Sequence, residues 1–394
     1  MTWAAVRAIS LRVVIIGDST AYTYTASDSL RGWGQELGLF FSPGAVTVIN
    51  KAIGGRSSRS FIEDGHWAST LAILQKGDIL LISFGTNDRG TVAERHADTA
   101  QFRQFLTQYV NESRAKGAIP VLVSTVNQNS WNGATFTEGF NIGNNDYHGA
   151  MLRVVTALSV PFIDLEQKSA ALFKSLGESY LASFIFIAGN THFQEMGAIA
   201  IAKLVAEGIK ELANDPDVGK LSTVLAPLFK VNVTSNKTGA ATLTASGDYP
   251  QNAPITLKAI PKSGQTFEAW SDESGKSLTT STHYSFTMKN SECSYTAKFQ
   301  GGTPIAGKED IVPATNPRVR IIISPLTFTK TVSIVSNEEM KSLRLCNTAG
   351  RIVETFYPNS HRATIDLHAF TTGAYFVSIH TSKRNYEQPI ILEK

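Results

Sequence analysis

The stretch LRVVIIGDST, residues 11–20, decides the fold. Its central residues Val13 to Ile16 are apolar without interruption, which is typical of a strand buried on both faces of a parallel sheet. The strand leads directly into Gly17-Asp18-Ser19, so a serine stands at the carboxyl end of a strand, where open α/β sheets build their sites. Because Gly-Asp-Ser is also ordinary turn chemistry, its interpretation depends on the rest of the chain.

Four further apolar runs of strand length follow before about residue 213, at 46–49, 79–82, 121–123 and 161–165. Amphipathic stretches separate them. Apolar side chains recur at helical spacing over 102–110, before Gly117, and another helix is predicted after Gly197. Strands that alternate with helices predict an α/β domain built on a parallel five-stranded sheet.

Beyond that domain the chain becomes rich in Thr and Ser, with short alternating strands between Gly and Pro residues, which predicts two small all-β domains. In the first of them, Trp270 is expected in the core. The predicted boundaries are 1–214 for the α/β domain, 215–228 for a linker, 229–300 for the first β domain, 301–318 for a second linker and 319–394 for a C-terminal β-sandwich.

Composition excludes several classes of function. The 36 Lys and Arg residues nearly balance 33 Asp and Glu, and no run of five like charges occurs, so no nucleic-acid partner is expected. No apolar stretch reaches the roughly 18 residues of a membrane span. Two cysteines are too few for a disulfide framework or a Cys-rich zinc site. No cofactor or metal is expected. The N-terminus MTWAAVRAIS lacks the apolar core of a signal peptide, which leaves a cytoplasmic protein or a removed leader.

Three other clusters follow strands or precede the last helix: 50–58 (NKAIGGRSS), 83–88 (SFGTND) and 189–193 (GNTHF). A parallel sheet would bring them to the same edge as Ser19. Acyl transfer needs a serine nucleophile, a histidine base and donors for the oxyanion. We expect Ser19 as nucleophile and His192 as base, with an oxyanion hole made by the backbone N–H groups of Ser19 and Gly55 and the side-chain amide of Asn87.

These motifs give the chain a family resemblance. With GDST, GGRSS, GTND and THF in this order, residues 11–213 resemble the SGNH (GDSL-type) hydrolases, and GGRSSRSF most resembles the rhamnogalacturonan acetylesterase group of carbohydrate esterases. The resemblance implies a three-layer α/β/α fold, metal-free serine catalysis and removal of acetyl groups from plant cell-wall polysaccharide. Arg56, Ser57 and Arg59 are candidate substrate-binding residues, because arginine can pair with the carboxylate of a sugar such as galacturonate.

One departure from the family pattern concerns the triad acid. The pattern has an aspartate three residues before the catalytic histidine, and here that position is Gly189. The acid normally holds the imidazole in its tautomer and stabilises the imidazolium. Three interpretations stay open: another acid or a carbonyl orients His192, the domain is a weakened esterase, or it only binds its glycan.

The remaining candidates are expected to be structural. Asp88 is predicted to support its loop and Asp164 to have a structural role. His66, His96 and His148 have no ligand-spaced partner and are predicted to be surface or capping residues.

The two β domains resemble known bacterial modules. The first, about 229–299, is similar to repeats related to internalin B-repeats, and the last is similar to the C-terminal sorting domain of type IX secretion in Bacteroidetes. The second resemblance implies an exported protein, secreted or attached to the cell surface, whose partner is an extracellular acetylated polysaccharide or oligosaccharide. The predicted function is a secreted rhamnogalacturonan or pectin acetylesterase. The alternatives are an acetyl xylan or broad short-chain esterase, and a non-catalytic glycan-binding protein.

Overall fold

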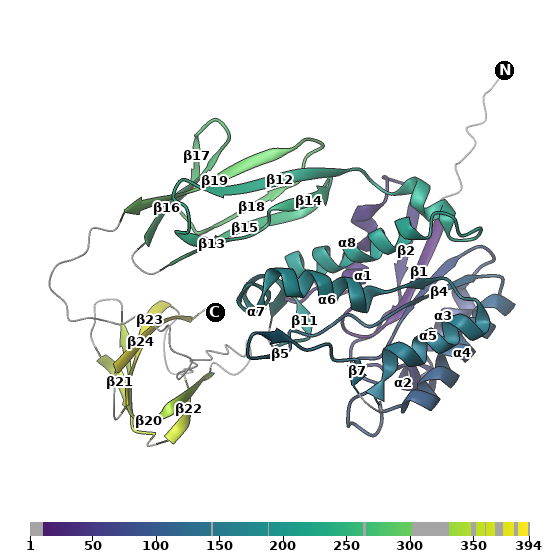
Figure 1. Ribbon diagram of the computed structural model, residues 1–394, viewed down its shortest axis with the longest axis horizontal. Coiled ribbons are helices and arrows are strands. Elements are labelled where there is room, and N and C mark those ends of the chain that lie inside the picture. Colours follow the sequence, from purple (N-terminus) through teal and green to yellow (C-terminus); the bar gives the residue numbers. More distant parts are fainter. Residues whose placement is uncertain are drawn as a thin grey trace. The chain divides into compact units, whose positions relative to one another are not determined.

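The computed structural model describes residues 11–142, 145–187, 189–262, 265–301, 331–347, 352–358, 360–366, 373–381 and 385–392. The chain forms two compact units, 1–301 and 302–394, and each is described by itself (Figure 1). The N-terminal stretch 1–10 and all but the first residue of the predicted linker 301–318 lie outside the described residues.

The first unit is built on a five-stranded parallel sheet with the strand order β2-β1-β3-β4-β9. Its strands are β2 (Val46–Asn50), β1 (Leu11–Gly17), β3 (Ile79–Ser83), β4 (Ile119–Val123) and β9 (Phe162–Ile163). The last strand is shorter than the apolar run 161–165, because the Asp164 side chain accepts a hydrogen bond from Gln167 N (3.1 Å) and thereby starts a helix at Leu165.

Helices cover both faces of this sheet, so the predicted three-layer α/β/α architecture is confirmed (Figure 1). Successive residues of a strand face opposite layers: Val13 and Ile15 pack into one core, and Val14 and Ile16 into the other. The first layer contains α1 (Trp33–Glu36), α6 (Leu165–Leu176) and α8 (Glu195–Glu211). The second contains α2 (Ser58–Glu63), α3 (His66–Ile73), α4 (Thr99–Ala115) and α5 (Tyr147–Leu158).

Short elements complete the α/β part of the unit. They are the helical turns η1 (Leu37–Phe40), α7 (Glu178–Tyr180), η2 (Leu181–Ile185) and η3 (Gly219–Val224), and the two-residue strands β5 (Trp131–Asn132), β6 (Thr135–Phe136), β7 (Asn141–Ile142), β8 (Asn145–Asp146), β10 (Phe186–Ile187) and β11 (His192–Phe193). The segment 215–228, predicted to be a linker, contains η3, and its residues Val218 and Leu221 are completely buried in the α/β core. It therefore contributes to packing as well as to connection.

The rest of the first unit is a β-sandwich, here called the β module (residues 228–301). One sheet has the order β14-β12-β19-β16-β17 and the other β13-β15-β18. Trp270 is completely buried between them, as expected. The strands are β12 (Leu228–Ser235), β13 (Ala241–Leu243), β14 (Gly247–Pro250), β15 (Pro254–Pro261), β16 (Gln265–Asp272), β17 (Ser277–Thr279), β18 (His283–Thr287) and β19 (Cys293–Gly301).

In the second unit the described residues lie in strands and the segments that connect them, in agreement with the predicted fold class. Its described strands form one antiparallel sheet, made of β20 (Thr331–Asn347), β21 (Ile352–Phe356), β22 (Ser360–Asp366), β23 (Gly373–Thr381) and β24 (Asn385–Leu392). In neither unit does a described helix have the length and apolar character that a membrane crossing requires.

Candidate active site

Ser19 and His192 come together at the carboxyl edge of the parallel sheet. Ser19 follows β1 directly, and His192 lies in β11, between η2 and α8. The Nε2 atom of His192 lies 3.0 Å from Oγ of Ser19, within hydrogen-bond distance, although the two residues are 173 positions apart in the chain. This is the arrangement in which an imidazole can take the proton of a serine hydroxyl.

The two loops expected to supply oxyanion donors lie against Ser19 and against each other. A Cβ atom built on Gly54 would lie 3.9 Å from Cβ of Ser19, so this backbone passes beside the nucleophile. Gly55 has φ +73°, a conformation that favours glycine. Asn87 donates one amide hydrogen to the carbonyl of Arg56 (Nδ2 to O, 3.0 Å), which leaves the second hydrogen of the same amide for a ligand.

The backbone N–H groups of Ser19 and Gly55 make no hydrogen bond within the described residues. Two backbone N–H groups and one hydrogen of the Asn87 amide are thus without a partner among the described residues. Such a set of donors can stabilise a tetrahedral oxyanion.

A buried carboxylate joins the two donor loops. Asp88 is completely buried and accepts hydrogen bonds from the backbone N of Ser58 (3.0 Å) and from its hydroxyl (2.5 Å). Burial raises the pKa of Asp88 to about 7. Asp88 thus supports its loop, as predicted.

The environment of His192 disfavours the charged form of its imidazole. Burial lowers the pKa of His192, while the nearby Asp18 carboxyl acts in the opposite direction. Asp18 is itself buried, which raises its pKa, and it accepts hydrogen bonds from the backbone N (2.9 Å) and hydroxyl (2.7 Å) of Thr20. A neutral imidazole is the form that can act as a general base.

The position of the missing triad acid is open. Gly189 is exposed and has φ +118°, and a Cβ built on it would have no heavy atom within 4 Å. Within the described residues, Nδ1 of His192 makes no hydrogen bond. The Asp18 carboxyl, which favours the charged form of this imidazole, hydrogen-bonds Thr20 and not His192.

The loop before His192 is held by side chains that the sequence did not single out. Gln128 donates to Oγ1 of Thr191 (2.6 Å), Arg89 donates to the side-chain oxygen of Gln128, and the backbone N of Asn129 donates to the carbonyl of Asn190 (2.8 Å). Arg89 stands two residues after Asn87, so this chain of contacts connects the oxyanion loop with the histidine loop.

The three residues expected to bind substrate have other contacts. Ser57 is completely buried and caps α2, accepting a hydrogen bond from Ser60 N (3.1 Å), so its side chain is not available to a polysaccharide. Arg56 forms an ion pair with Asp64 (2.6 Å) and Arg59 forms one with Glu63 (2.8 Å). Only the two arginines are partly exposed, and each already has a carboxylate partner.

A different arginine lies beside the oxyanion donors. Nη1 of Arg95 lies 3.4 Å from the Cβ position of Gly55 and 3.5 Å from Oδ1 of Asn87. Arg95 is partly buried, and among the described residues no carboxylate pairs with it. No motif marks this residue in the sequence.

His148, predicted to be a surface or capping residue, is instead partly buried and contacts Asp164. Its Nε2 lies 3.1 Å from both carboxylate oxygens of Asp164, and this hydrogen bond raises the pKa of His148. Asp164 also accepts a hydrogen bond from Ser124 Oγ (3.2 Å). Asp164 is structural, as predicted, because it joins α5 to the start of α6.

Comparison with known proteins identifies all three parts of the chain. Residues 15–197 match the GDSL-like lipase/acylhydrolase family, residues 230–303 the divergent InlB B-repeat domain and residues 325–393 the secretion system C-terminal sorting domain. The sorting domain indicates secretion or localisation at the cell surface.

Curated relatives cover the first half of the chain. The probable rhamnogalacturonan acetylesterase YesY of Bacillus subtilis is 38% identical over 206 residues, which are 51% of this chain and 93% of that protein. The rhamnogalacturonan acetylesterase RhgT of the same organism is 38% identical over 218 residues, 51% of this chain and 90% of that protein. A rhamnogalacturonan acetylesterase of Emericella nidulans is 26% identical over 216 residues, 50% of this chain and 83% of that protein. Over its first half, the chain therefore belongs to the GDSL-like lipase/acylhydrolase family and is an esterase.

Proposed function

We propose that this protein is a secreted serine esterase that removes acetyl groups from rhamnogalacturonan-type polysaccharide. The observation that carries the proposal is the 3.0 Å contact between Ser19 Oγ and His192 Nε2 beside unused N–H donors. The relatives named as rhamnogalacturonan acetylesterases and the secretion sorting domain support the substrate class and the extracellular location.

The proposed reaction has two steps. In the first, Ser19 Oγ attacks the acetyl carbonyl while His192 takes the hydroxyl proton, and the N–H donors of Ser19, Gly55 and Asn87 hold the oxyanion. Collapse of this intermediate breaks the ester bond, and His192 returns the proton to the leaving sugar hydroxyl. In the second, His192 activates a water that attacks the acetyl-enzyme, which releases acetate and restores Ser19.

Arg95 is the proposed contact for an acidic sugar. It lies over the backbone of Gly55 without a carboxylate partner in the described part of the chain, so its guanidinium can receive a substrate carboxylate. Rhamnogalacturonan carries such carboxylates and xylan backbones do not, which makes Arg95 a candidate determinant of substrate choice.

The first test is acetate release from acetylated rhamnogalacturonan by the wild type and by Ser19→Ala. We expect the variant to lose at least about 10³-fold in kcat, since the nucleophile is removed. Equal release by both proteins would contradict serine catalysis. No release by either would favour the glycan-binding alternative, for which the specific observation is that Nδ1 of His192 has no partner among the described residues.

The second test separates acidic from neutral substrates. Arg95→Gln should reduce kcat/KM on acetylated rhamnogalacturonan about tenfold more than on acetylated xylan or p-nitrophenyl acetate, the value of a charge-assisted contact. Arg59→Gln is the matched control, because Arg59 is paired with Glu63. A higher wild-type kcat/KM on acetylated xylan than on rhamnogalacturonan would favour the acetyl xylan or broad esterase alternative.

A further inference from the structure

The strand that carries His192 has only two residues, and its position depends on its neighbours. His192 pairs with Ile187 of β10, and the carbonyl of Phe193 accepts a hydrogen bond from the backbone N of Arg31 (2.9 Å). Since no acid holds Nδ1 of His192 among the described residues, the imidazole has its direct hydrogen bond to Ser19 only. The groups that fix this strand therefore also fix the geometry of the site.

Gln194 is the side chain that ties the end of this strand to its surroundings. Its Nε2 donates to the carbonyls of Ser183 (3.1 Å) and Phe186 (3.3 Å), and its backbone N donates to the carbonyl of Ile185 (3.1 Å). Gln194 is also the N-cap residue of α8. It thus joins η2, β10 and α8 two residues after His192.

The remaining polar atom of the Gln194 amide is occupied by the β module. Nζ of Lys258, in β15, donates to Oε1 of Gln194 over 2.7 Å and lies 5.6 Å from the ring centre of Phe184. The ammonium pairs with no carboxylate of the described residues, and burial lowers its pKa. Lys258 is 64 positions from Gln194, so this contact connects the β module to the catalytic strand.

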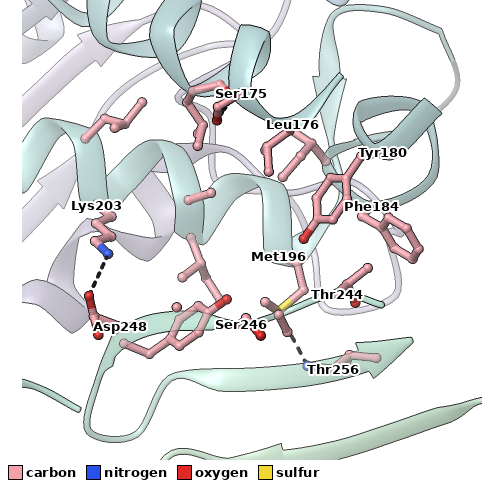
Figure 2. A pocket seen from close by; sticks show the side chains of 18 of the residues that line it. Ser175, Leu176, Tyr180, Phe184, Met196, Lys203, Thr244, Ser246, Asp248 and Thr256 are labelled. Carbon is pink, nitrogen blue, oxygen red and sulfur yellow. Dashed lines mark hydrogen bonds and ion pairs between the residues drawn. The ribbon is translucent and has the colours of Figure 1, made fainter. Parts of the chain in front are cut away.

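Other polar contacts between the β module and the α/β part lie nearby. A cavity of about 510 Å³ lies between α6, η2 and α8 on one side and the segment 244–258 on the other. Figure 2 shows side chains that line it. At its border, Lys203 and Asp248 form an ion pair over 3.8 Å, and the backbone N of Thr256 points to Sδ of Met196 over 3.4 Å (Figure 2). Of these three bridges, the one from Lys258 ends nearest to His192 in the chain.

We infer that the β module is a part of the catalytic apparatus, in which Lys258 acts as a positioning residue that holds His192 against Ser19 through Gln194. The inference rests on the proposed serine esterase activity for its kinetic consequence. The position of the His192 imidazole itself does not depend on which substrate the protein binds.

The test compares Lys258→Met with a matched control in the full chain. Lys298 lies in the same module, and its Nζ donates to the carbonyl of Gly275 (3.2 Å), inside the module. Lys298→Met therefore removes an equal charge without touching the contact to Gln194. Lys258→Arg tests rescue, since a guanidinium can still donate to the Gln194 oxygen.

We expect Lys258→Met to lower kcat on p-nitrophenyl acetate about tenfold with KM unchanged, because a small displacement of a catalytic group acts on the chemical step. Lys258→Arg should recover most of this loss, and Lys298→Met should behave as the wild type. Thermal unfolding of each variant shows whether a loss reflects unfolding.

A second measurement does not depend on activity. The ring resonance of His192, identified by its loss in His192→Gln, is followed by NMR as a function of pH. Lys258→Met should change the shift and the titration midpoint of this resonance, and Lys298→Met should not. If the wild type releases no acetate, the proposed function fails and this spectrum still decides the inference. An identical His192 titration in both lysine variants would overturn it.

Discussion

Gly189→Asp tests whether the missing acid limits this esterase. The position is exposed, and a side chain there would meet no heavy atom within 4 Å of its Cβ, so space does not oppose an aspartate. The backbone does, because φ is +118°, and a non-glycine residue in such a conformation costs about 1–3 kcal/mol. A native domain is typically stable by about 5–15 kcal/mol, so most molecules should stay folded.

The possible gain in kcat corresponds to a larger free energy than the cost of the backbone conformation. In a triad, loss of the acid can reduce kcat by about 10⁴, and an aspartate on a strained loop should recover part of that factor. We expect Gly189→Asp to raise kcat at least about tenfold, which corresponds to about 1.4 kcal/mol of the barrier. The assay is initial-rate hydrolysis of p-nitrophenyl acetate at 25 °C, with the midpoint of urea unfolding measured in parallel.

Gly189→Ala is the control that makes the result interpretable. Alanine carries the same backbone strain without a carboxylate, so the two variants should lose similar stability and differ in turnover. If Gly189→Asp is no faster than Gly189→Ala, then residue 189 is not where this site lacks an acid. That result would favour the interpretation that another acid or a carbonyl orients His192.

Three other predictions follow from the site and its surroundings. Burial lowers the pKa of His192, and only the neutral imidazole accepts a proton. We therefore expect kcat/KM to be constant near pH 7 and to fall on acidification with a midpoint below 6.5. A midpoint above 7 in a pH–rate profile would contradict this. Asn87→Ala removes one oxyanion donor and should lower kcat about 10²-fold with little change in KM, whereas an unchanged kcat in steady-state assays would exclude Asn87 from the oxyanion hole. Glu166 is buried, and neither of its carboxylate oxygens has a hydrogen-bond partner within the described structure. Burial raises the pKa of Glu166 to about 7. The folded state therefore holds this proton more tightly than the unfolded state, and it loses stability as pH rises from about 4.5 to 7. Glu166→Gln should therefore gain about 2–3 kcal/mol relative to the wild type between pH 5 and pH 8 in urea unfolding, and a pH-independent difference would show that Glu166 is ionised throughout.

The fold was predictable because buried parallel strands have an unmistakable composition. The runs at Val13–Ile16 and Ile79–Ile82 are buried on both faces, as their uninterrupted apolar sequence predicts for central strands of a parallel sheet. The apolar pattern was less informative at the end of β9. The run 161–165 predicted a longer strand, but Asp164 caps the helix that begins at Leu165. The segment 215–228 has a linker-like composition, although Val218 and Leu221 pack into the core.

The site was predictable only in part. The motifs around Ser19 and His192 identify residues that the structure brings to 3.0 Å, although their roles stay a prediction. Arg95 could not be found, because its significance depends on how a loop returns over Gly55. The same holds for Lys258, which lies in another domain of the sequence and meets Gln194 only through tertiary packing.

The buried link between Asp88 and Ser58 has a consequence for the engineering and divergence of this family of sites. Substitutions in the GGRSS loop and in the GTND loop depend on each other. Asp88 of the second loop accepts hydrogen bonds from Ser58 of the first, and Asn87 donates to the carbonyl of Arg56. A chimera that imports either loop alone from a relative would leave a buried acid without its partner. Residues 54–58 and 85–88 therefore form one unit, and both loops would have to be exchanged together to keep their contacts.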